Sequence, residues 1–396
     1  MQACLPRGCA GTNEALRGER VCLILIIITI GAWPLRPLPR NRYPMRPRVI
    51  GKTCIVLPLA ATLLTAPLAL ASAPLKVHAP RLNDPEAPIF AAFTQETGIP
   101  IELVSLSMEE LTSAFEAALA SEAEPPVDVL MVVDTGNIHR LMEAGWLQPL
   151  ESESLETRVP VELRDLEAGW SGYATRARVI YVNPDKIDWV PESYEALADE
   201  RLAGKLCLGG GASAYNTSLM ASVVAHHGEA AAEEWAEALV ANLAQPAGGR
   251  DSELLQALAA PGDCAVTLAN HYYYLRLLES ENAEEQSTAE ALKLVWPNQQ
   301  GEGLEGRGAY RNVAAFAVAQ GTPRAEQAVR FLEHTAGVAM QRDVAGGIFF
   351  PVVAEGVDEI NAEQRLGHAS MDTLSMRQLT GHLSKARQIL ARVGWE

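Results

Sequence analysis

Basic side chains are scarce in most of this sequence. The chain has 396 residues and a formal net charge of −17, but its first 71 residues hold nine Lys and Arg and only two Asp and Glu. The remainder therefore carries 23 basic and 47 acidic residues, a net charge of −24. A surface this acidic argues against nucleic acid and anionic lipid as partners, because both are themselves negatively charged.

Signatures of catalysis and of nucleotide binding are also missing. Gly209-Gly210-Gly211 does not complete a G-x-G-x-x-G fingerprint, no Walker lysine follows it, and no H-E-x-x-H motif occurs. We find no nucleophile paired with a base and no internal repeat. These absences favour a binding protein over an enzyme.

Two apolar runs lie near the start of the chain. Val21–Ile30 has about ten residues, which is too short to span. A second apolar run follows Met45 and three basic residues, and it ends in Ala69-Leu70-Ala71. This order predicts a cleaved signal peptide at residues 45–71, an over-extended reading frame at residues 1–44, and a soluble periplasmic protein. An N-terminal membrane anchor is the alternative.

Only two of the six cysteines, Cys207 and Cys264, follow that segment. A pair of cysteines in an exported protein favours a disulfide. Each opens an apolar, strand-like run, and neighbouring strands could bring the two sulfur atoms into range. Two free buried thiols are the alternative.

Short apolar strands alternate with amphipathic helices from Leu75 onward, which predicts an α/β fold with a largely parallel sheet. The expected strands are 75–77, 101–104, 127–133, 178–182, 206–208, 264–269 and 313–318. The expected helices are 89–96, 108–120, 137–144, 193–197, 218–227, 235–243, 275–279, 325–332 and 371–393.

Three consecutive tyrosines, Tyr272, Tyr273 and Tyr274, stand at one strand-to-helix corner. A phenol has a pKa near 10, so its anion needs a strong Lewis acid or another fixed charge beside it at neutral pH. Fe(III) is one cation that would fit such a cluster. Aromatic packing is the alternative, and helix geometry lets only one or two of the three face the core.

Several further segments have a recognisable order and spacing: Phe93–Ile99, Asp128–Met131, Glu143–Leu147, Arg176–Asn183, Tyr215–Leu219, Ala269–Tyr273, Pro297–Gln299 and Val393–Trp395. Together they resemble the periplasmic ferric-iron binding proteins, which are the solute receptors of iron ABC transporters. The resemblance covers residues 75–396. It implies a monomeric receptor that delivers Fe(III) to a permease of the inner membrane.

The resemblance also implies an α/β clamshell of two lobes joined by two crossing β-strands. Lobe 1 would comprise residues 72–177 and 309–349. Lobe 2 would comprise residues 178–308 and 350–396.

In that family, two adjacent tyrosines at the position of Tyr272 and Tyr273 ligate the iron, and one branch adds a third at the position of Tyr215. Three phenolates neutralise a trivalent ion and match its preference for oxygen. Tyr215 lies where a helix is expected to begin, and free backbone N–H groups there can hold a synergistic anion near Ser213.

The first lobe departs from the family pattern, because a loop that usually reads Ser-Arg-His-Tyr ends in Arg81, Leu82 and Asn83 here. Closure over iron is therefore expected to involve other groups or a bound anion. The candidates for binding the anion or closing the site are Arg81, Asn83, Asp134, Arg178, Ser213 and Asn312. His78, at the end of the first strand, could replace a lost ligand, with a packed histidine as the alternative. A small anion or an organic solute is the alternative cargo.

Overall fold

Local sequence signals place most helices close to where they occur. The computed structural model describes residues 73–395 except 81, 83, 85 and 86, and all of these lie in one unit, residues 68–396. Helix α2 (Met108–Ser121) begins at a capping box: the Ser107 side chain accepts from the Glu110 backbone N–H, and the Glu110 carboxylate accepts from that of Ser107. The proposed signal peptide, Arg81 and Asn83 lie outside the described residues.

The strands are β1 (Leu75–His78), β2 (Ile101–Leu103), β3 (Val129–Val133), β4 (Arg164–Asp165), β5 (Trp170–Val182), β6 (Val266–Asn270), β7 (Lys293–Val295), β8 (Arg311–Val318) and β9 (Phe350–Pro351). The first α-helices are α1 (Pro88–Thr97), α2, α3 (Thr135–Glu143), α4 (Glu153–Arg158), α5 (Ala214–His227), α6 (Glu229–Ala241) and α7 (Asp251–Ala259). The later ones are α8 (His271–Glu279), α9 (Ala283–Glu290), α10 (Ala325–Thr335), α11 (Val338–Gly346), α12 (Asn361–Leu366), α13 (Met376–Thr380) and α14 (Leu383–Arg392). Short 3₁₀ turns are η1 (Val161–Leu163), η2 (Glu195–Ala198) and η3 (Glu200–Leu202).

The sheet has the order β2-β1-β3-β8-β5-β4, and β6, β7 and β9 also pair with β5. Strand β1 pairs in parallel with β2 and β3, as the helical crossovers α1 and α2 require. The prediction of a largely parallel sheet is wrong beyond this point, because β8 runs antiparallel to β3 and β5 runs antiparallel to its partners. Apolar periodicity indicates which face of a strand is buried, but it carries no information on strand direction.

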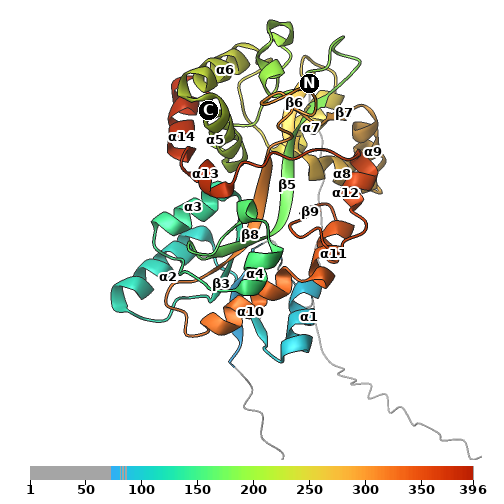
Figure 1. The fold of residues 1–396 in the computed structure, drawn as a ribbon. Coiled ribbons are helices and arrows are strands. Elements are labelled where there is room, and N and C mark those ends of the chain that lie inside the picture. The colour runs from blue at the N-terminus through green and yellow to red at the C-terminus, as the bar shows by residue number, and fades with distance from the viewer. Residues whose placement is uncertain (1–72, 81, 83, 85–86, 396) are drawn as a thin grey trace, which may run out of the picture. The chain divides into compact units, whose positions relative to one another are not determined.

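Strand β5 is longer than its apolar segment predicts, since it begins at Trp170 rather than Arg178. Residues 170–177 pair with β8, whereas residues 178–182 pair with β6. Figure 1 shows β5 and β8 running between the two groups of helices. The first part of β5 contains polar residues and so lacks the apolar pattern that predicts a strand. These residues are buried only because strands far along the chain pair with them.

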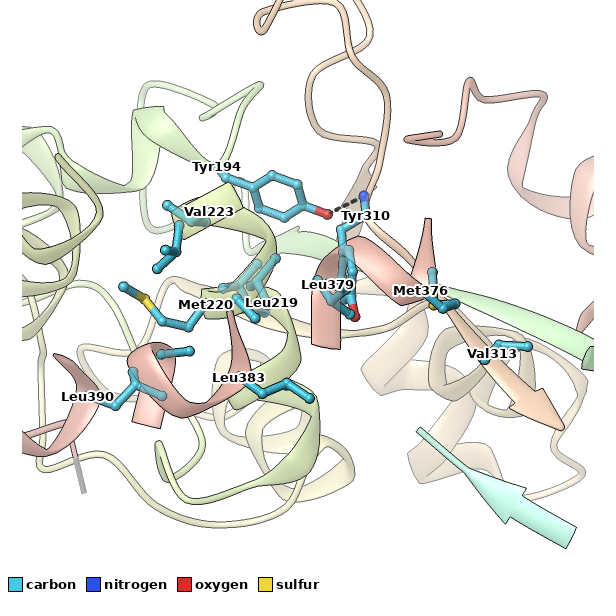
Figure 2. Close-up of a cluster of buried hydrophobic side chains, with 14 of the residues drawn as sticks. Tyr194, Leu219, Met220, Val223, Tyr310, Val313, Met376, Leu379, Leu383 and Leu390 are labelled. Carbon is cyan, nitrogen blue, oxygen red and sulfur yellow. Dashed lines mark hydrogen bonds between the residues drawn. The ribbon is translucent and has the colours of Figure 1, made fainter. Parts of the chain in front are cut away.

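A cluster of apolar side chains joins α5 to the end of the chain (Figure 2). Leu219 of α5 packs there with Leu379 of α13 and Leu383 of α14. The expected single helix over 371–393 is two helices, α13 and α14. Met371 forms a β-bridge with Ala309 instead of a helical turn, so a tertiary contact overrides the helical pattern.

The Tyr194 hydroxyl reaches across this cluster and accepts a hydrogen bond from the Tyr310 backbone N–H at 2.9 Å (Figure 2). The same hydroxyl donates to the carbonyl of Arg178 at 2.5 Å. One buried phenol therefore links the segment before β8 to β5 and satisfies one backbone group in each.

The predicted disulfide between Cys207 and Cys264 is confirmed, with Cα atoms 5.5 Å apart. The expected strand at 206–208 is reduced to bridges of Leu206 to Leu243 and Val266. Among the described helices, none combines the length and the apolar composition needed to cross a bilayer.

Candidate functional site

The three tyrosines occupy the first turn of α8. Strand β6 is buried throughout and ends at Asn270, the residue that precedes the helix. Successive residues of a helix point about 100° apart, so the three phenols cannot all face the same way. Tyr272 is 4% exposed, while Tyr273 and Tyr274 are half-buried.

Two of these tyrosines meet Tyr215 of α5. The Tyr272 hydroxyl is hydrogen-bonded to the side chains of both Tyr273 and Tyr215. The ring centroids of Tyr272 and Tyr273 are 4.5 Å apart, and the Asn270 amide donates to the Tyr272 hydroxyl at 3.3 Å. The structure thus brings together the three residues that the sequence predicts as metal ligands.

Tyr274 points elsewhere. Its hydroxyl bonds to the carbonyls of Ala289 and Leu292, at 3.1 and 3.0 Å, and its ring packs against Tyr181. It supports the fold around α9 and is not part of the cluster of Tyr215, Tyr272 and Tyr273, which we call the phenol cluster.

Three guanidinium groups surround the phenol cluster. Arg276 lies over the ring of Tyr272, 5.2 Å from its centroid, and Arg176 and Arg178 lie 5.5 and 5.8 Å from the centroid of Tyr215. Cations in this position attract the electron-rich ring faces. They also favour any anion, including a phenolate, that forms nearby.

The Tyr272 hydroxyl is neutral when no cation binds. Burial raises its pKa above the ordinary value of a phenol, and the hydrogen bond with Tyr273 raises it further, against the opposing effect of Tyr215. Ionisation of this hydroxyl therefore requires a strongly positive partner.

Arg178 is a buried structural cation as well as a neighbour of Tyr215. It donates to the carboxylate of Asp251 at 2.6 Å and to the side-chain carbonyl of Asn216 at 2.8 Å. Burial opposes its charged form, but Asp251 more than offsets this and raises the pKa of Arg178. Since Asn216 follows Tyr215 directly, Arg178 fixes the turn of α5 that carries this tyrosine.

Asp134 and Asn312, two candidates from the sequence, bind each other in a separate buried network. The Asn312 amide donates to one carboxylate oxygen of Asp134 at 2.8 Å, and Arg176 donates to the same oxygen at 3.3 Å. The other oxygen accepts from Ser218 at 2.6 Å and from the backbone N–H of Gly136 at 2.8 Å.

This network encloses Asp134 completely. Its side chain is inaccessible to solvent, and its backbone has a φ of +84°, which is unusual for a residue other than glycine. Burial raises the pKa of Asp134 despite the nearby Arg176. The structure thus places Asp134 where it joins β3, β5, β8 and α5 rather than at an open surface.

Ser213 immediately precedes α5, which begins at Ala214, four residues before the predicted start. Its side chain makes no capping hydrogen bond, and Tyr215 lies in the first turn. The backbone N–H groups of a first helical turn and the helix dipole favour an anion. Ser213 therefore lies where the sequence predicts a synergistic anion.

Arg276 was not among the site residues predicted from the sequence. It lies four residues after Tyr272, a spacing that puts both on the same face of α8. The prediction also missed Asp251 and Asn216, for which no local signal exists, because their role depends on Arg178 in a distant strand. Within the described part of the chain, no three His, Cys, Asp or Glu side chains gather as a metal site.

Comparisons with known proteins identify the family of this chain. The family of bacterial extracellular solute-binding proteins matches residues 124–368. Iron uptake protein A1 of Synechocystis is 35% identical over 326 residues, which cover 81% of this chain and 87% of that protein. Iron uptake protein A2 of the same organism is 34% identical over 299 residues, 75% of this chain and 84% of that protein.

Solved structures are similar over the same region. A Trichodesmium protein in complex with iron and citrate is 32% identical with a TM-score of 0.74, covering 82% of this chain and 100% of that one. Ferric iron-binding protein A of Mannheimia haemolytica, in an open conformation, is 28% identical with a TM-score of 0.73, covering 82% of this chain and 99% of that one.

Proposed function

Because this chain belongs to the bacterial extracellular solute-binding proteins, we propose that it captures ferric iron through Tyr215, Tyr272 and Tyr273 and delivers it to an ABC permease. Family membership makes the chain a solute-binding protein rather than an enzyme. Its mixed α/β fold is that of the periplasmic binding proteins.

The observation that carries the proposal is the hydrogen bonding of Tyr272 to both Tyr273 and Tyr215. Three hydroxyls this close can bind one ion together. Fe(III) is hard and highly charged, so it prefers oxygen ligands and stabilises their anionic forms. Three phenolates would balance its charge and release three protons on binding. Iron affinity should therefore weaken as the pH falls.

A small anion would complete the coordination sphere in this proposal. The first turn of α5 at Ser213 offers backbone N–H groups, and Arg176 and Arg276 add positive charge around the phenol cluster. Arg81 and Asn83 stay candidates from the sequence for the same role. The iron and citrate bound by the Trichodesmium relative support an iron–anion pair as the cargo.

The proposal includes the lobes and the location expected from the sequence. Residues 72–177 with 309–349 would form lobe 1, and residues 178–308 with 350–396 would form lobe 2, with β5 and β8 as the connections. Export by the signal peptide would place a monomeric receptor in the periplasm, where it can meet its permease.

A cargo other than iron is the second candidate, and Leu82 is the observation that favours it. In the ferric-iron binding proteins that this sequence resembles, the loop that contains Leu82 usually supplies a metal ligand. Here Leu82 is partly buried and packs against the apolar core that includes β1. An apolar residue cannot coordinate a metal ion. If iron does not bind, the same lobes would take a small anion or an organic solute.

Ferric titration of the protein expressed from Met45 tests the two candidates. A ferric phenolate absorbs visible light, so iron uptake from ferric citrate should produce a coloured protein. Tyr272→Phe and Tyr273→Phe should each abolish the band, because each removes a ligand. Tyr274→Phe is the matched control and should keep it, since this hydroxyl bonds to Ala289 and Leu292. A colourless wild-type protein would exclude ferric iron as the cargo.

A further inference from the structure

A cavity of about 960 Å³ adjoins the phenol cluster at Tyr215. The rest of its wall comes mainly from α2, α3 and β3, with His78 at the end of β1 and Trp146. In the view of Figure 1, α3 lies between α2 and α5. Cavities of this size hold ligands with tens of atoms. An ion with one small anion would leave most of the volume empty, because a water molecule occupies only about 30 Å³ of liquid.

The wall of this cavity is mainly apolar. Twelve of its eighteen lining residues are apolar. One of them, Trp146, stacks on Phe115 with ring centroids 4.6 Å apart. Two others, Met108 and Leu119 of α2, are 58% and 42% exposed. These side chains gain from burial, so an apolar group in the cavity would be stabilised there. A free metal ion or a carbonate would gain nothing from such a wall.

The polar side chains of the wall are His78, Thr112, Glu116, Asn137, Arg140 and Tyr215. The His78 ring is 3% exposed, and its Nδ1 lies 3.1 Å from the carbonyl oxygen of Val104. A carbonyl only accepts, so the Nδ1 of His78 donates this hydrogen bond. Thr112 and Arg140 add a hydroxyl and a positive charge to the same wall, and Glu116 adds a negative charge.

We propose that the cargo is a ferric chelate of an aromatic oxygen-donor chelator of the catecholate class. Its iron would bind the phenol cluster, and its aromatic ring would enter the cavity beside Tyr215. This inference rests on the proposed function, because it specifies the form in which the iron arrives. Chelator oxygens fill the coordination positions that three phenolates leave open, which explains why the described side chains of lobe 1 need supply no anionic ligand.

Filling the cavity tests this inference. Thr112→Phe places a ring on the cavity side of α2, and Ser113→Phe places the same ring on the exposed face of that helix as a matched control. The probes are the ferric complex of 2,3-dihydroxybenzoate and ferric citrate. Wild-type protein should bind the aromatic complex the more tightly. Thr112→Phe should weaken that complex about tenfold or more and change citrate binding less than about twofold, while Ser113→Phe should change neither.

The other outcomes separate the two proposals. If Thr112→Phe leaves the aromatic complex unaffected, or weakens both complexes equally, the ring does not use the cavity and the inference is overturned. If wild-type protein binds ferric citrate but favours the aromatic complex no more than citrate, the inference fails and the iron function stands. If it binds neither complex, the proposed function fails as well.

Discussion

Adjacent tyrosines in α8 have different surroundings because a helix turns each residue away from the last. Tyr272 and Tyr273 lie within reach of Tyr215, whereas Tyr274 bonds to the carbonyls before β7. The sequence predicts this division, since one or two of three consecutive helical residues can share a face. Which two they are depends on the position of α5, and that is a property of the tertiary structure.

His271, beside Tyr272, is a buried histidine that remains neutral. Its Nδ1 accepts from the backbone N–H of Ala177 at 3.2 Å, and its Nε2–H donates to the carbonyl of Ile348 at 3.0 Å. Burial lowers its pKa to about 3, against the opposing effect of these two backbone bonds. The ring joins β5 to the segment before β9 and does so in its neutral form.

We therefore predict that stability falls as the pH drops from 6.5 towards 3. In this range an unfolded chain binds a proton at His271 and the folded chain does not. The contribution of this residue to the change in the free energy of unfolding therefore approaches about 1.4 kcal/mol per pH unit. Urea unfolding between pH 7.5 and 4.5 measures it. His271→Gln can keep both hydrogen bonds without titrating, and should show a shallower slope than the wild type.

The control for this measurement is His368→Gln, because the side chain of His368 is 80% exposed. This variant should keep the wild-type slope. Identical slopes for His271→Gln and the wild type would show that His271 does not set the pH dependence.

At the scale of elements, the disulfide ties the segment before α5 to the segment that enters β6. It closes a sequence separation of 57 residues. A crosslink of this kind stabilises mainly by restricting the unfolded chain. The two elements that follow it, α5 and β6, lead to Tyr215 and to the tyrosine corner, so the bond supports the frame of the site without contributing to its chemistry.

Replacing both sulfurs, in Cys207→Ser with Cys264→Ser, should lower the free energy of unfolding by about 2–4 kcal/mol. The visible ferric band should persist, because no sulfur belongs to the phenol cluster. Urea unfolding of the double variant and of reduced wild-type protein measures the loss, and the two should agree. A lost band in the folded variant would contradict a purely structural role.

Strand β5 shows how one element can serve two parts of the fold. Its first residues pair with β8, its last with β6, and its two arginines connect Asp134 on one side and Asp251 on the other. Each ion pair is buried, so removing one partner would leave an uncompensated charge. The crossing strands thus carry the charge network beneath Tyr215.

At the scale of the whole molecule, the acidic composition and the absence of catalytic motifs predict a binding protein, and the family confirms the binding role. The order of its segments, taken jointly, indicated the correct family although each motif is weak alone. About four fifths of this chain aligns with each similar structure, and the alignment includes nearly the full length of that structure.

Export is the prediction that concerns the complete chain. Expression from Met45 in a host with a periplasm should yield a protein whose N-terminus lies at or near Ser72, because Ala69-Leu70-Ala71 matches the A-x-A pattern of a cleavage site. Mass spectrometry of the periplasmic fraction measures the terminus. Substituting Ala69 and Ala71 by bulky residues should block cleavage. A periplasmic protein that still begins at Met45 and retains residues 45–71 would contradict the predicted cleavage site.

The sequence by itself determined the features that local chemistry encodes. Apolar periodicity located most helices and several strands, cysteine number and export context indicated Cys207–Cys264, and the run of tyrosines contains two members of the phenol cluster. These signals hold because they depend on residues a few positions apart, whose spacing decides which face is buried.

Only the tertiary structure decided how distant segments meet. The antiparallel course of β5 and β8, the enclosure of Asp134 by Asn312, and the cavity beside Tyr215 join residues up to 178 positions apart. Burial and partners for a polar side chain such as Arg178 or Asp134 come from the elements that pack around it. No local pattern records them, because the same residues would be ordinary exposed charges in a different packing.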